Sequence, residues 1–214
     1  MSNDFLTPAD KIPFEHLALR RSFRSDIGNK RAINQDSYGF LKSEHASLFV
    51  VADGIGGAQA GEIASALATN MVCRGSFTSD GTLLENNLRE AVGRANTRIY
   101  QSSQESPDLS GMGTTLVAVA VNRNDIFWAS VGDSRIYRWR DGAVDRLTSD
   151  HTLVQELLNT GNLSLEEAGN HPLGHMLTRS LGPLSQVEVD ICSHPGGVVH
   201  GDRYLLCCDG VTNY

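Results

Sequence analysis

The sequence has few of the features that mark membrane, secreted or nucleic-acid-binding proteins. No apolar run approaches the roughly 20 residues that span a bilayer, and the N-terminal segment lacks the basic start and long apolar stretch of a secretory signal. These absences predict a cytoplasmic protein with no membrane partner. Positive charge is also scarce, because 18 Lys and Arg face 25 Asp and Glu and leave a net charge of −7. We therefore expect no nucleic-acid partner, since phosphate backbones require a basic face.

Cysteine is present at four positions, but no pair has the spacing of a metal-binding or redox motif. Neighbouring cysteines on a strand point to opposite faces, so Cys207 and Cys208 are not expected to act together. The cysteines are interpreted as small core hydrophobes in a reducing compartment rather than as disulfides or zinc ligands.

Length and composition predict one globular domain. The chain has 214 residues, 40% of them hydrophobic and 20% charged, which is enough to form a sizeable core. Internal repeats, low-complexity tracts and long linkers are lacking.

Hydrophobic periodicity predicts blocks of strands and a pair of amphipathic helices. Four of the strands are separated by short turns and are expected to form an antiparallel meander. The pattern predicts an α+β fold with two packed antiparallel β-sheets flanked by pairs of helices. The expected strands are His16–Ser25, Ser37–Leu41, Leu48–Ala52, Thr114–Val121, Ile126–Val131, Ser134–Trp139, Ala143–Leu147, Gln186–Ile191 and Arg203–Cys208; the expected helices are Ala60–Gly75, Gly81–Ser102 and, less regular, His151–Asn170.

Four aspartates lie at or next to the ends of expected strands: Asp36, Asp53, Asp133 and Asp209. Each one alone is typical of a turn. If the strand ends converge, however, the carboxylates repel one another unless cations lie between them. Hard cations such as Mg²⁺ or Mn²⁺ take carboxylate and carbonyl oxygens as ligands. Because glycine has no Cβ, the backbone carbonyl of Gly54 can approach such an ion closely.

Two further patterns leave alternatives open. Lys and Arg are concentrated between residues 20 and 31, which is compatible with a local anion site or with a solvated strand face. His171 and His175 are separated by Pro172 and Gly174, which favours loop histidines over a helical pair of zinc ligands.

Six motifs occur in an order and spacing that resemble the metal-dependent PP2C-type (PPM) protein serine/threonine phosphatases of bacteria. The resemblance runs from about Phe14 to Tyr214 and implies a phosphatase domain at 14–214 after an extension at 1–13, with a flap-like insert at about 151–177. It also implies a β-sandwich flanked by helix pairs. The motifs are RAINQD (31–36), DGIGG (53–57), GTT (113–115), GDSR (132–135), LTRSLG (177–182) and CDGVTN (208–213).

The resemblance also implies a role for each aspartate. Asp53 is expected to bridge two Mg²⁺ or Mn²⁺ ions, with the Gly54 carbonyl on one ion and Asp209 on the other. Asp36 is expected to hold a metal through water, and Asp133 to help bind a weaker third ion. Each role is carried over from the matching motif position.

Arg31 corresponds to the phosphate-binding arginine of the family, which favours an anion site in the basic stretch. The implied reaction is hydrolysis of phosphoserine and phosphothreonine by a metal-activated water, with Arg31, Asp36 and Asp53 as catalytic residues. The implied partner of this signalling enzyme is a phosphoprotein, such as a Ser/Thr kinase or its target, and we expect a monomer.

The family continues through a helix and further strands to another aspartate that binds the second metal, whereas this sequence ends five residues after Asp209. We therefore expect the last elements of the family fold to be lacking. Two functions follow: a protein serine/threonine phosphatase, or a catalytically weak or inactive phosphatase-like module that binds a partner.

Overall fold

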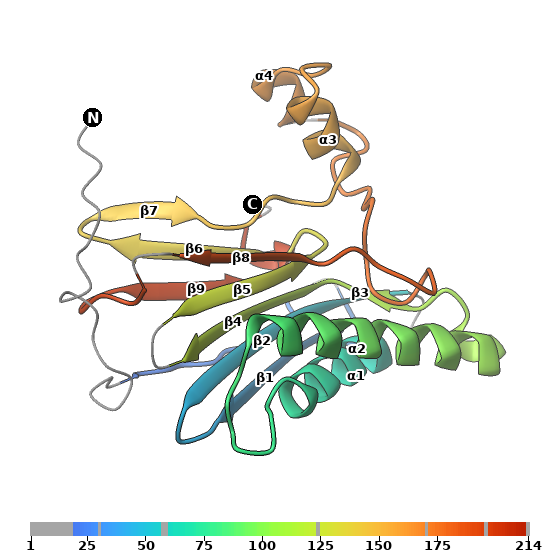
Figure 1. Ribbon diagram of the computed structural model, residues 1–214. Coiled ribbons are helices and arrows are strands. Elements are labelled where there is room, and N and C mark those ends of the chain that lie inside the picture. Colours follow the sequence, from blue (N-terminus) through green and yellow to red (C-terminus); the bar gives the residue numbers. More distant parts are fainter. Residues whose placement is uncertain are drawn as a thin grey trace.

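A computed structural model shows two antiparallel sheets lying face to face, with two long helices over the outer face of one sheet (Figure 1). It describes residues 19–29, 31–56, 60–122, 125–169, 171–194 and 197–212. The expected extension at 1–13 and residues 14–18 lie outside these ranges. The predicted α+β fold with two packed antiparallel sheets is confirmed.

The larger sheet has six strands, and the smaller has three. The path of the larger sheet is β1-β2-β4-β5-β8, with the short β3 paired to β2, and the order of the smaller is β7-β6-β9. All of these pairs are antiparallel. The strands are β1 (Asp36–Lys42), β2 (Ala46–Ile55), β3 (Gly113–Thr114), β4 (Leu116–Asn122), β5 (Ile126–Val131), β6 (Arg135–Arg140), β7 (Ala143–Arg146), β8 (Asp190–His194) and β9 (Arg203–Cys207).

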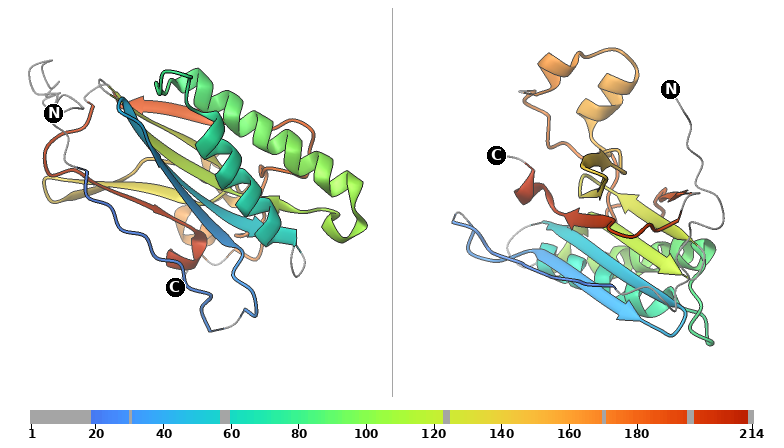
Figure 2. Two further views of the ribbon diagram at one scale, coloured as in Figure 1. Left: turned by 90° about the horizontal axis from the view of Figure 1, so that it is seen from below. Right: turned by 90° about the vertical axis from the view of Figure 1, so that its left-hand side faces the viewer.

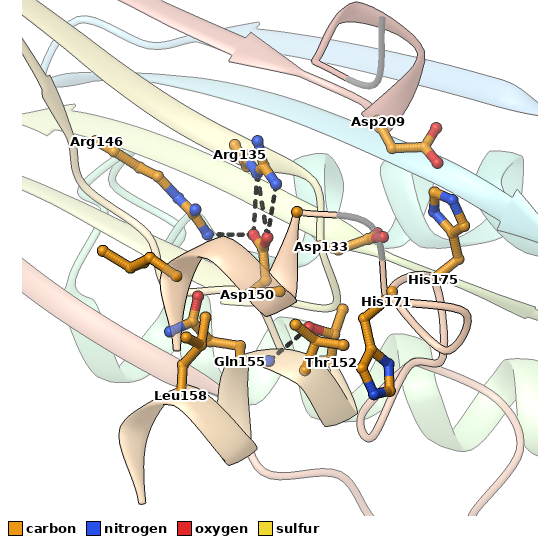
Figure 3. A pocket seen from close by; sticks show the side chains of 15 residues that line it. Asp133, Arg135, Arg146, Asp150, Thr152, Gln155, Leu158, His171, His175 and Asp209 are labelled. Atoms are coloured by element: carbon orange, nitrogen blue, oxygen red, sulfur yellow. Dashed lines mark hydrogen bonds and ion pairs between the residues drawn. The ribbon is translucent and has the colours of Figure 1, made fainter. Parts of the chain in front are cut away.

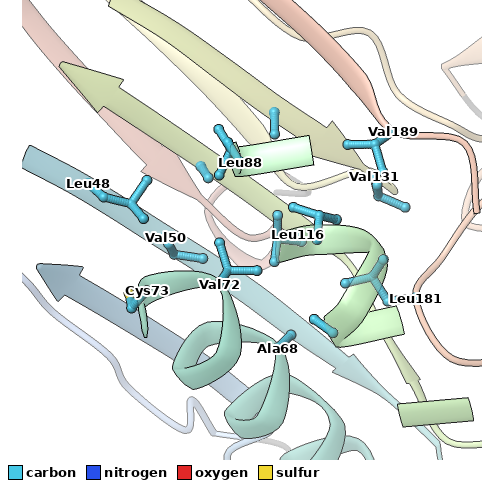
Figure 4. Close-up of a cluster of buried hydrophobic side chains, with 14 of the residues drawn as sticks. Leu48, Val50, Ala68, Val72, Cys73, Leu88, Leu116, Val131, Leu181 and Val189 are labelled. Carbon is cyan, nitrogen blue, oxygen red and sulfur yellow. The ribbon is translucent and has the colours of Figure 1, made fainter. Parts of the chain in front are cut away.

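Strand β4 explains how one chain fills two cores. Its alternate residues Leu116, Ala118 and Ala120 pack toward the helices, in the core shown in Figure 4. The residues between them, including Val117 and Val119, pack toward the smaller sheet. Because successive side chains point to opposite faces, a strand covered on both faces requires an unbroken apolar run, and this is what β4 contains.

Helices α1 (Ala60–Gly75) and α2 (Glu85–Glu105) cover the outer face of the larger sheet. In α1, Ala64, Ala68 and Val72 repeat every four residues and are fully buried, so this face contacts the sheet. Small side chains let the helix approach β1 and β2 closely. None of the helices in the described parts of the chain combines the length and hydrophobicity that a bilayer span requires.

The expected helix at 151–170 is two short helices, α3 (Leu153–Asn159) and α4 (Leu165–Ala168), which project beyond the strand ends (Figure 1). Gly161 has a φ of +72° and turns the chain between them. The single-turn helices η3 (Pro107–Leu109) and η4 (Asp209–Val211) are the other helical elements described. The sequence predicts pairs of helices on the sheets. The described ranges contain one such pair, α1 and α2, which covers the larger sheet.

The predicted strand at 16–25 is wrong where the structure describes it, because residues 19–25 form no ladder. The segment runs beside β1 and packs through side chains: the Phe23 ring stacks on Tyr38 with centroids 5.0 Å apart, and the Arg21 guanidinium lies 4.2 Å from the centroid of Phe40. The alternation in the sequence therefore reflects side-chain packing along an edge strand rather than backbone pairing.

The predicted meander is also wrong, because it is divided between the two sheets. Strand β4 pairs with β5, but β5 then pairs with β8, while β6 pairs with β7 and β9. The Gly-Asp turn at 132–133 is a crossing from one sheet to the other, not a hairpin. That crossing brings the turn to the junction of the sheets.

The strand expected at 186–191 begins only at Asp190, because α2 holds the preceding segment. The Arg89 guanidinium donates to the Val189 carbonyl at 2.8 Å, and the Asn96 amide donates to the Leu184 carbonyl at 3.0 Å. The shift also places Cys192 at an exposed position, contrary to the expected core role, while the other three cysteines are buried; all four are free.

A buried ion pair joins the ends of β6 and β9. The Arg140 guanidinium donates to Asp202 at 2.6 and 2.7 Å, and the Val199 amide and the Tyr204 hydroxyl complete the carboxylate's partners. The Asp202 side chain is 1% exposed. Burial acts to raise the pKa of Asp202, but the hydrogen bonds from Arg140 and its neighbours outweigh it and hold the pKa below its ordinary value.

Replacing Asp202 by Asn is expected to lower the free energy of unfolding at pH 7 by about 3 kcal/mol, because it leaves Arg140 buried without its counter-charge. Since the folded-state pKa is depressed, this stabilisation is present above the unfolded pKa of about 3.9 and is lost as pH falls through the folded value. Urea unfolding at pH 7 and in acid measures both effects. The exposed i,i+4 pair Glu90–Arg94 is the control: Glu90→Gln is expected to cost about 0.5 kcal/mol or less, and an equal loss in both variants would contradict the prediction.

Candidate metal centre and active site

The pairing of β1 with β2 places two carboxylates on one face of the larger sheet. Asp36 lies directly opposite Asp53 in the antiparallel register, and opposed residues of such a pair project from the same face with Cβ atoms about 5 Å apart. A further bond between the strands, from the Gly54 amide to the Gln35 carbonyl at 3.0 Å, extends this contact past the ladder. The register alone therefore makes Asp36 and Asp53 neighbours.

The end of β9 brings a third carboxylate from the facing sheet. Strand β9 ends at Cys207, next to the ends of β1 and β2 (Figure 2). Asp209 follows at the start of η4, and its carboxyl group lies close enough to Asp53 to raise the pKa of that residue. Three of the aspartates singled out in the sequence thus meet at the junction of the sheets.

This junction is electrostatically unfavourable without a cation. Asp53 is 9% exposed. Burial first, and then the charges of Asp36 and Asp209, raise the pKa of Asp53 to about 8, while the Arg31 guanidinium acts in the opposite direction. A carboxyl group with such a pKa retains its proton at neutral pH unless positive charge enters the site. The donors are oxygen atoms, which suit hard divalent cations.

Asp133 lies in the turn that crosses between the sheets, close enough to Asp209 for the two charges to interact. Burial, followed by the charges of Asp209 and Asp150, raises the pKa of Asp133 to about 6. Gly132 has a φ of +98°, and a Cβ there would lie 2.7 Å from the Thr115 methyl carbon, so glycine is required before this aspartate. Asp133 extends the acidic site toward the insert formed by α3 and α4.

A cavity of about 390 Å³ adjoins Asp133 and Asp209 beneath that insert (Figure 3). Its wall includes the Arg135 and Arg146 guanidinium groups, both paired with the buried carboxylate of Asp150. The expected loop histidines, His171 and His175, lie in or beside a turn as predicted and also line this cavity. Their part in the cavity was not evident from the sequence, because it depends on how the insert folds over the strand ends.

Arg31 lies at the exposed rim of the acidic cluster. Its guanidinium donates to the side-chain oxygen of Gln35 at 3.4 Å, and its charge lowers the pKa of Asp53. The other described arginines of the basic stretch follow the coil that runs along β1. Of the two open interpretations of this stretch, the position of Arg31 supports an anion site, and the rest of the stretch has the character of a solvated face.

Gly54 is required by packing. A Cβ at this position would lie 2.1 Å from the Gly61 carbonyl oxygen in the first turn of α1. The two glycines therefore let α1 begin directly over β2. The close approach holds the backbone beside Asp53 in place.

Several supporting residues were not identified from the sequence. The Thr115 hydroxyl accepts from the Asp53 amide at 3.0 Å and pairs with the Ser134 hydroxyl at 2.7 Å, which joins the strand of Asp53 to the turn of Asp133. His151 accepts from the Gly132 amide at 3.1 Å through Nδ1 and contacts Asp190 at 3.0 Å through Nε2. These contacts cross from strand to strand, so only a three-dimensional arrangement reveals them.

The family profile of Protein phosphatase 2C matches residues 28–214. The chain belongs to the protein phosphatase 2C family. Among its relatives, the serine/threonine phosphatase stp of Listeria welshimeri is 38% identical over 200 residues, which are 91% of this chain and 79% of that protein. The serine/threonine protein phosphatase PstP of Mycobacterium tuberculosis is 39% identical over 197 residues, 92% of this chain and 37% of that protein.

Solved structures agree with the family assignment. A serine/threonine phosphatase from S. agalactiae has a TM-score of 0.79 at 38% identity, covering 88% of this chain and 78% of that chain. The catalytic domain of PstP with two manganese ions has a TM-score of 0.73 at 36% identity, covering 89% of this chain and 77% of that one. The predicted PPM resemblance, sandwich fold and protein serine/threonine phosphatase class are confirmed, and a purely binding module is not favoured.

Replacing Thr115 by Val is expected to lower the free energy of unfolding by about 1–3 kcal/mol, because the Asp53 amide and the Ser134 hydroxyl lose a buried partner while shape is retained. Urea unfolding checks this. In the control Thr97→Val, an exposed hydroxyl of α2 bonded to the Gly93 carbonyl is removed, and a change within about 0.5 kcal/mol is expected. Indistinguishable values for the two variants would show that Thr115 does not support the site.

Proposed function

We propose that this phosphatase hydrolyses phosphoserine and phosphothreonine in proteins at the junction of the two sheets, where Asp36, Asp53 and Asp209 meet. The observation that carries the proposal is the convergence of three carboxylates from both sheets on one site, where the pKa of Asp53 is raised to about 8. A fold that encloses mutually repelling carboxylates is suited to holding cations there.

The residues fit two divalent cations, Mg²⁺ or Mn²⁺, and a weaker third. In this proposal Asp53, the Gly54 carbonyl and Asp209 would hold the two principal ions, and Asp36 would act through a water. Asp133 serves the third ion. The two manganese ions named for the related PstP catalytic domain support the count, and the all-oxygen donor set supports hard cations. When bound, such ions lower the pKa of water and stabilise charge on phosphoryl oxygens.

Arg31 is proposed to bind the substrate phosphate. Its exposed position at the rim of the acidic cluster leaves the guanidinium accessible to a phosphoryl group, and its planar set of donors fits two phosphate oxygens at once. The same charge offsets the negative charge that develops on those oxygens during in-line attack by water. Asp36 and Asp53 would hold the cations opposite Arg31, so the phosphate would lie between two sources of positive charge.

The substrates are phosphoproteins. We propose a Ser/Thr kinase or its target as the partner, consistent with a signalling role in the cytoplasm, and a monomer as the acting species. The phosphatase domain is proposed to extend over 14–214, with the insert at about 151–177 beside the substrate. The cavity lined by Asp133, Asp209 and this insert adjoins the acidic site and offers space for the residues that flank the phosphorylated side chain.

Phosphate release from a phosphothreonine peptide tests the proposal. Activity is expected with Mn²⁺ and is expected to disappear with a chelator, and Asp53→Asn is expected to lower kcat/KM by about 100-fold or more. The matched control is Asp108→Asn, which changes an exposed aspartate of η3 and should keep wild-type kinetics. Activity that survives chelation, or an equal rate in Asp53→Asn, would contradict the proposed centre.

Although Asp53→Asn is expected to lower activity, it is expected to raise the stability of the metal-free protein. Because the folded-state pKa of Asp53, about 8, lies above the unfolded value of about 3.9, the folded protein binds more protons between these values. Its stability is therefore expected to fall as pH rises through this window. Asp53→Asn in chelator should have the higher Tm at pH 9 and little advantage at pH 4. A Tm difference independent of pH would show that charge repulsion is not the cause.

Arg31→Ala is expected to lower kcat/KM for the phosphopeptide by about 100-fold at saturating Mn²⁺, because a charged phosphate contact is lost. Arg31→Lys should recover part of the loss, since an ammonium group restores charge but not the paired donors. Arg24→Ala is the control within the same basic stretch, with a side chain 88% exposed. Steady-state kinetics of the three variants measure the effect, and equal behaviour of Arg24→Ala and Arg31→Ala would refute the assignment.

A further inference from the structure

Two arginines share one buried carboxylate in the wall of the cavity beneath the insert. Asp150 is 9% exposed and pairs with both Arg135 and Arg146. Arg135 alone engages both carboxylate oxygens, because its Nε lies 3.1 Å from Oδ1 and its Nη2 lies 2.8 Å from Oδ2. A bidentate pair of this kind neutralises the carboxylate. Arg146 therefore brings one positive charge in excess to this part of the wall.

Most of the Arg146 guanidinium is available to a ligand. Its Nη2 donates to Asp150, which is the only hydrogen-bond or ion-pair partner of Arg146 among the described residues. A guanidinium group has five N–H donors, so most of them have no partner in the described parts of the protein. The Arg146 side chain lines the cavity and is 31% exposed, so a molecule in the cavity can reach it.

The other polar groups near Arg146 offer no competing acceptor. The Thr152 hydroxyl accepts from the Gln155 amide at 3.2 Å, and the Gln155 side chain donates to Asn159 at 2.9 Å, so both residues serve helix α3. His171 accepts from the Leu173 amide through Nδ1 at 3.2 Å. The neutral His171 ring therefore carries its proton on Nε2 and can only donate there.

We infer that this cavity is a specificity subsite for a second anionic group of the substrate, and that Arg146 binds that group. The group is a carboxylate or a phosphoryl group on a residue close to the one that is dephosphorylated. The inference rests on the proposed function, because it assumes that the phosphorylated side chain is held at the adjoining acidic site. The favoured substrates are then segments that are acidic or carry more than one phosphate.

The position and size of the cavity fit a residue that flanks the phosphorylated one. Asp133 and Asp209, which are assigned to the cations, lie on one side of the cavity, and Arg146 lies on the other (Figure 3). A peptide that extends from the cations into the cavity therefore meets Arg146. The volume of about 390 Å³ is in the range of ligand sites. Val154 and Leu158 add apolar wall, which excludes water and strengthens a charge pair.

Phosphothreonine peptides with one altered neighbour test the subsite. Each position within about four residues of the phosphothreonine, a reach of about 14 Å, carries in turn Glu, Gln, Ser or the non-hydrolysable phosphonate analogue of phosphoserine. At one or two positions Glu is expected to raise kcat/KM about tenfold over Gln, and the phosphonate to raise it at least as much over Ser. A gain from the phosphonate alone identifies a phosphoryl subsite, and a gain from both identifies a general anion subsite. No gain at any position would overturn the inference.

Substitution of Arg146 separates binding from a structural role. In Arg146→Gln the ratio of kcat/KM between acidic and neutral peptides is expected to fall below about twofold, and Arg146→Lys should keep an intermediate ratio, because an ammonium group lacks the paired donors. The control is Arg98→Gln, which removes an arginine of α2 paired with Glu105 and should keep wild-type values. An Arg146→Gln variant that slows all peptides equally, with the ratio retained, would overturn the inference. Thermal melting checks folding, and Arg146→Lys carries the test if the glutamine variant does not fold.

Binding measurements distinguish failure of the subsite from failure of the proposed function. The same peptides, with the phosphonate analogue of phosphothreonine at the central position, are titrated in Mn²⁺ and followed by fluorescence anisotropy. Hydrolysis of phosphothreonine peptides without an Arg146-dependent preference in kcat/KM or Kd would refute the subsite alone. An Arg146-dependent difference of about tenfold in Kd, in a protein with no Mn²⁺-dependent hydrolysis, would refute the proposed function and support the subsite.

Discussion

Repulsion among carboxylates that are partly or fully buried at one site is the constraint around which this molecule is arranged. Asp36 and Asp53 are forced together by the register of β1 and β2, and β9 adds Asp209 from the facing sheet. The two hydrophobic cores, one between the helices and the larger sheet and one between the sheets, offset this unfavourable energy. A cation at the junction would turn the same repulsion into attraction.

The carboxylates are carried by paired strands, and hydrogen bonds connect the segments that carry them. Asp36 and Asp53 belong to paired strands, and the Thr115–Ser134 contact links β2 to the turn of Asp133. His151 binds the turn from the side of the insert through the Gly132 amide. Sites carried on strands and braced by a second layer of hydrogen bonds keep their geometry better than sites on free loops. The cavity beneath the insert, by contrast, is walled largely by short helices and turns.

Local patterns predicted much of the secondary structure. The stretches 60–75 and 126–131 form α1 and β5 with the expected bounds, because a broad apolar helix face and a short doubly buried strand leave little ambiguity. The expectations that failed concern pairing. Residues 19–25 alternate like a strand but contact β1 only through side chains. The four consecutive strands after Gly113 resemble a meander, yet the chain changes sheets at residues 132–133. Pairing partners are chosen by burial over the whole molecule, which a local pattern does not contain.

From the sequence alone, six ordered motifs determine the family, the sandwich fold and an oxygen-rich set of aspartates, because glycine turns and apolar periods are properties of short segments. Only the tertiary structure decided which groups share a site. It placed Cys208, interpreted from sequence as a core hydrophobe, beside Asp36 and Asp53, and it placed His171 and His175 in the wall of the cavity. Residues about 170 positions apart meet through the packing of one sheet on another, and electrostatic coupling depends on that separation in space rather than on distance along the chain.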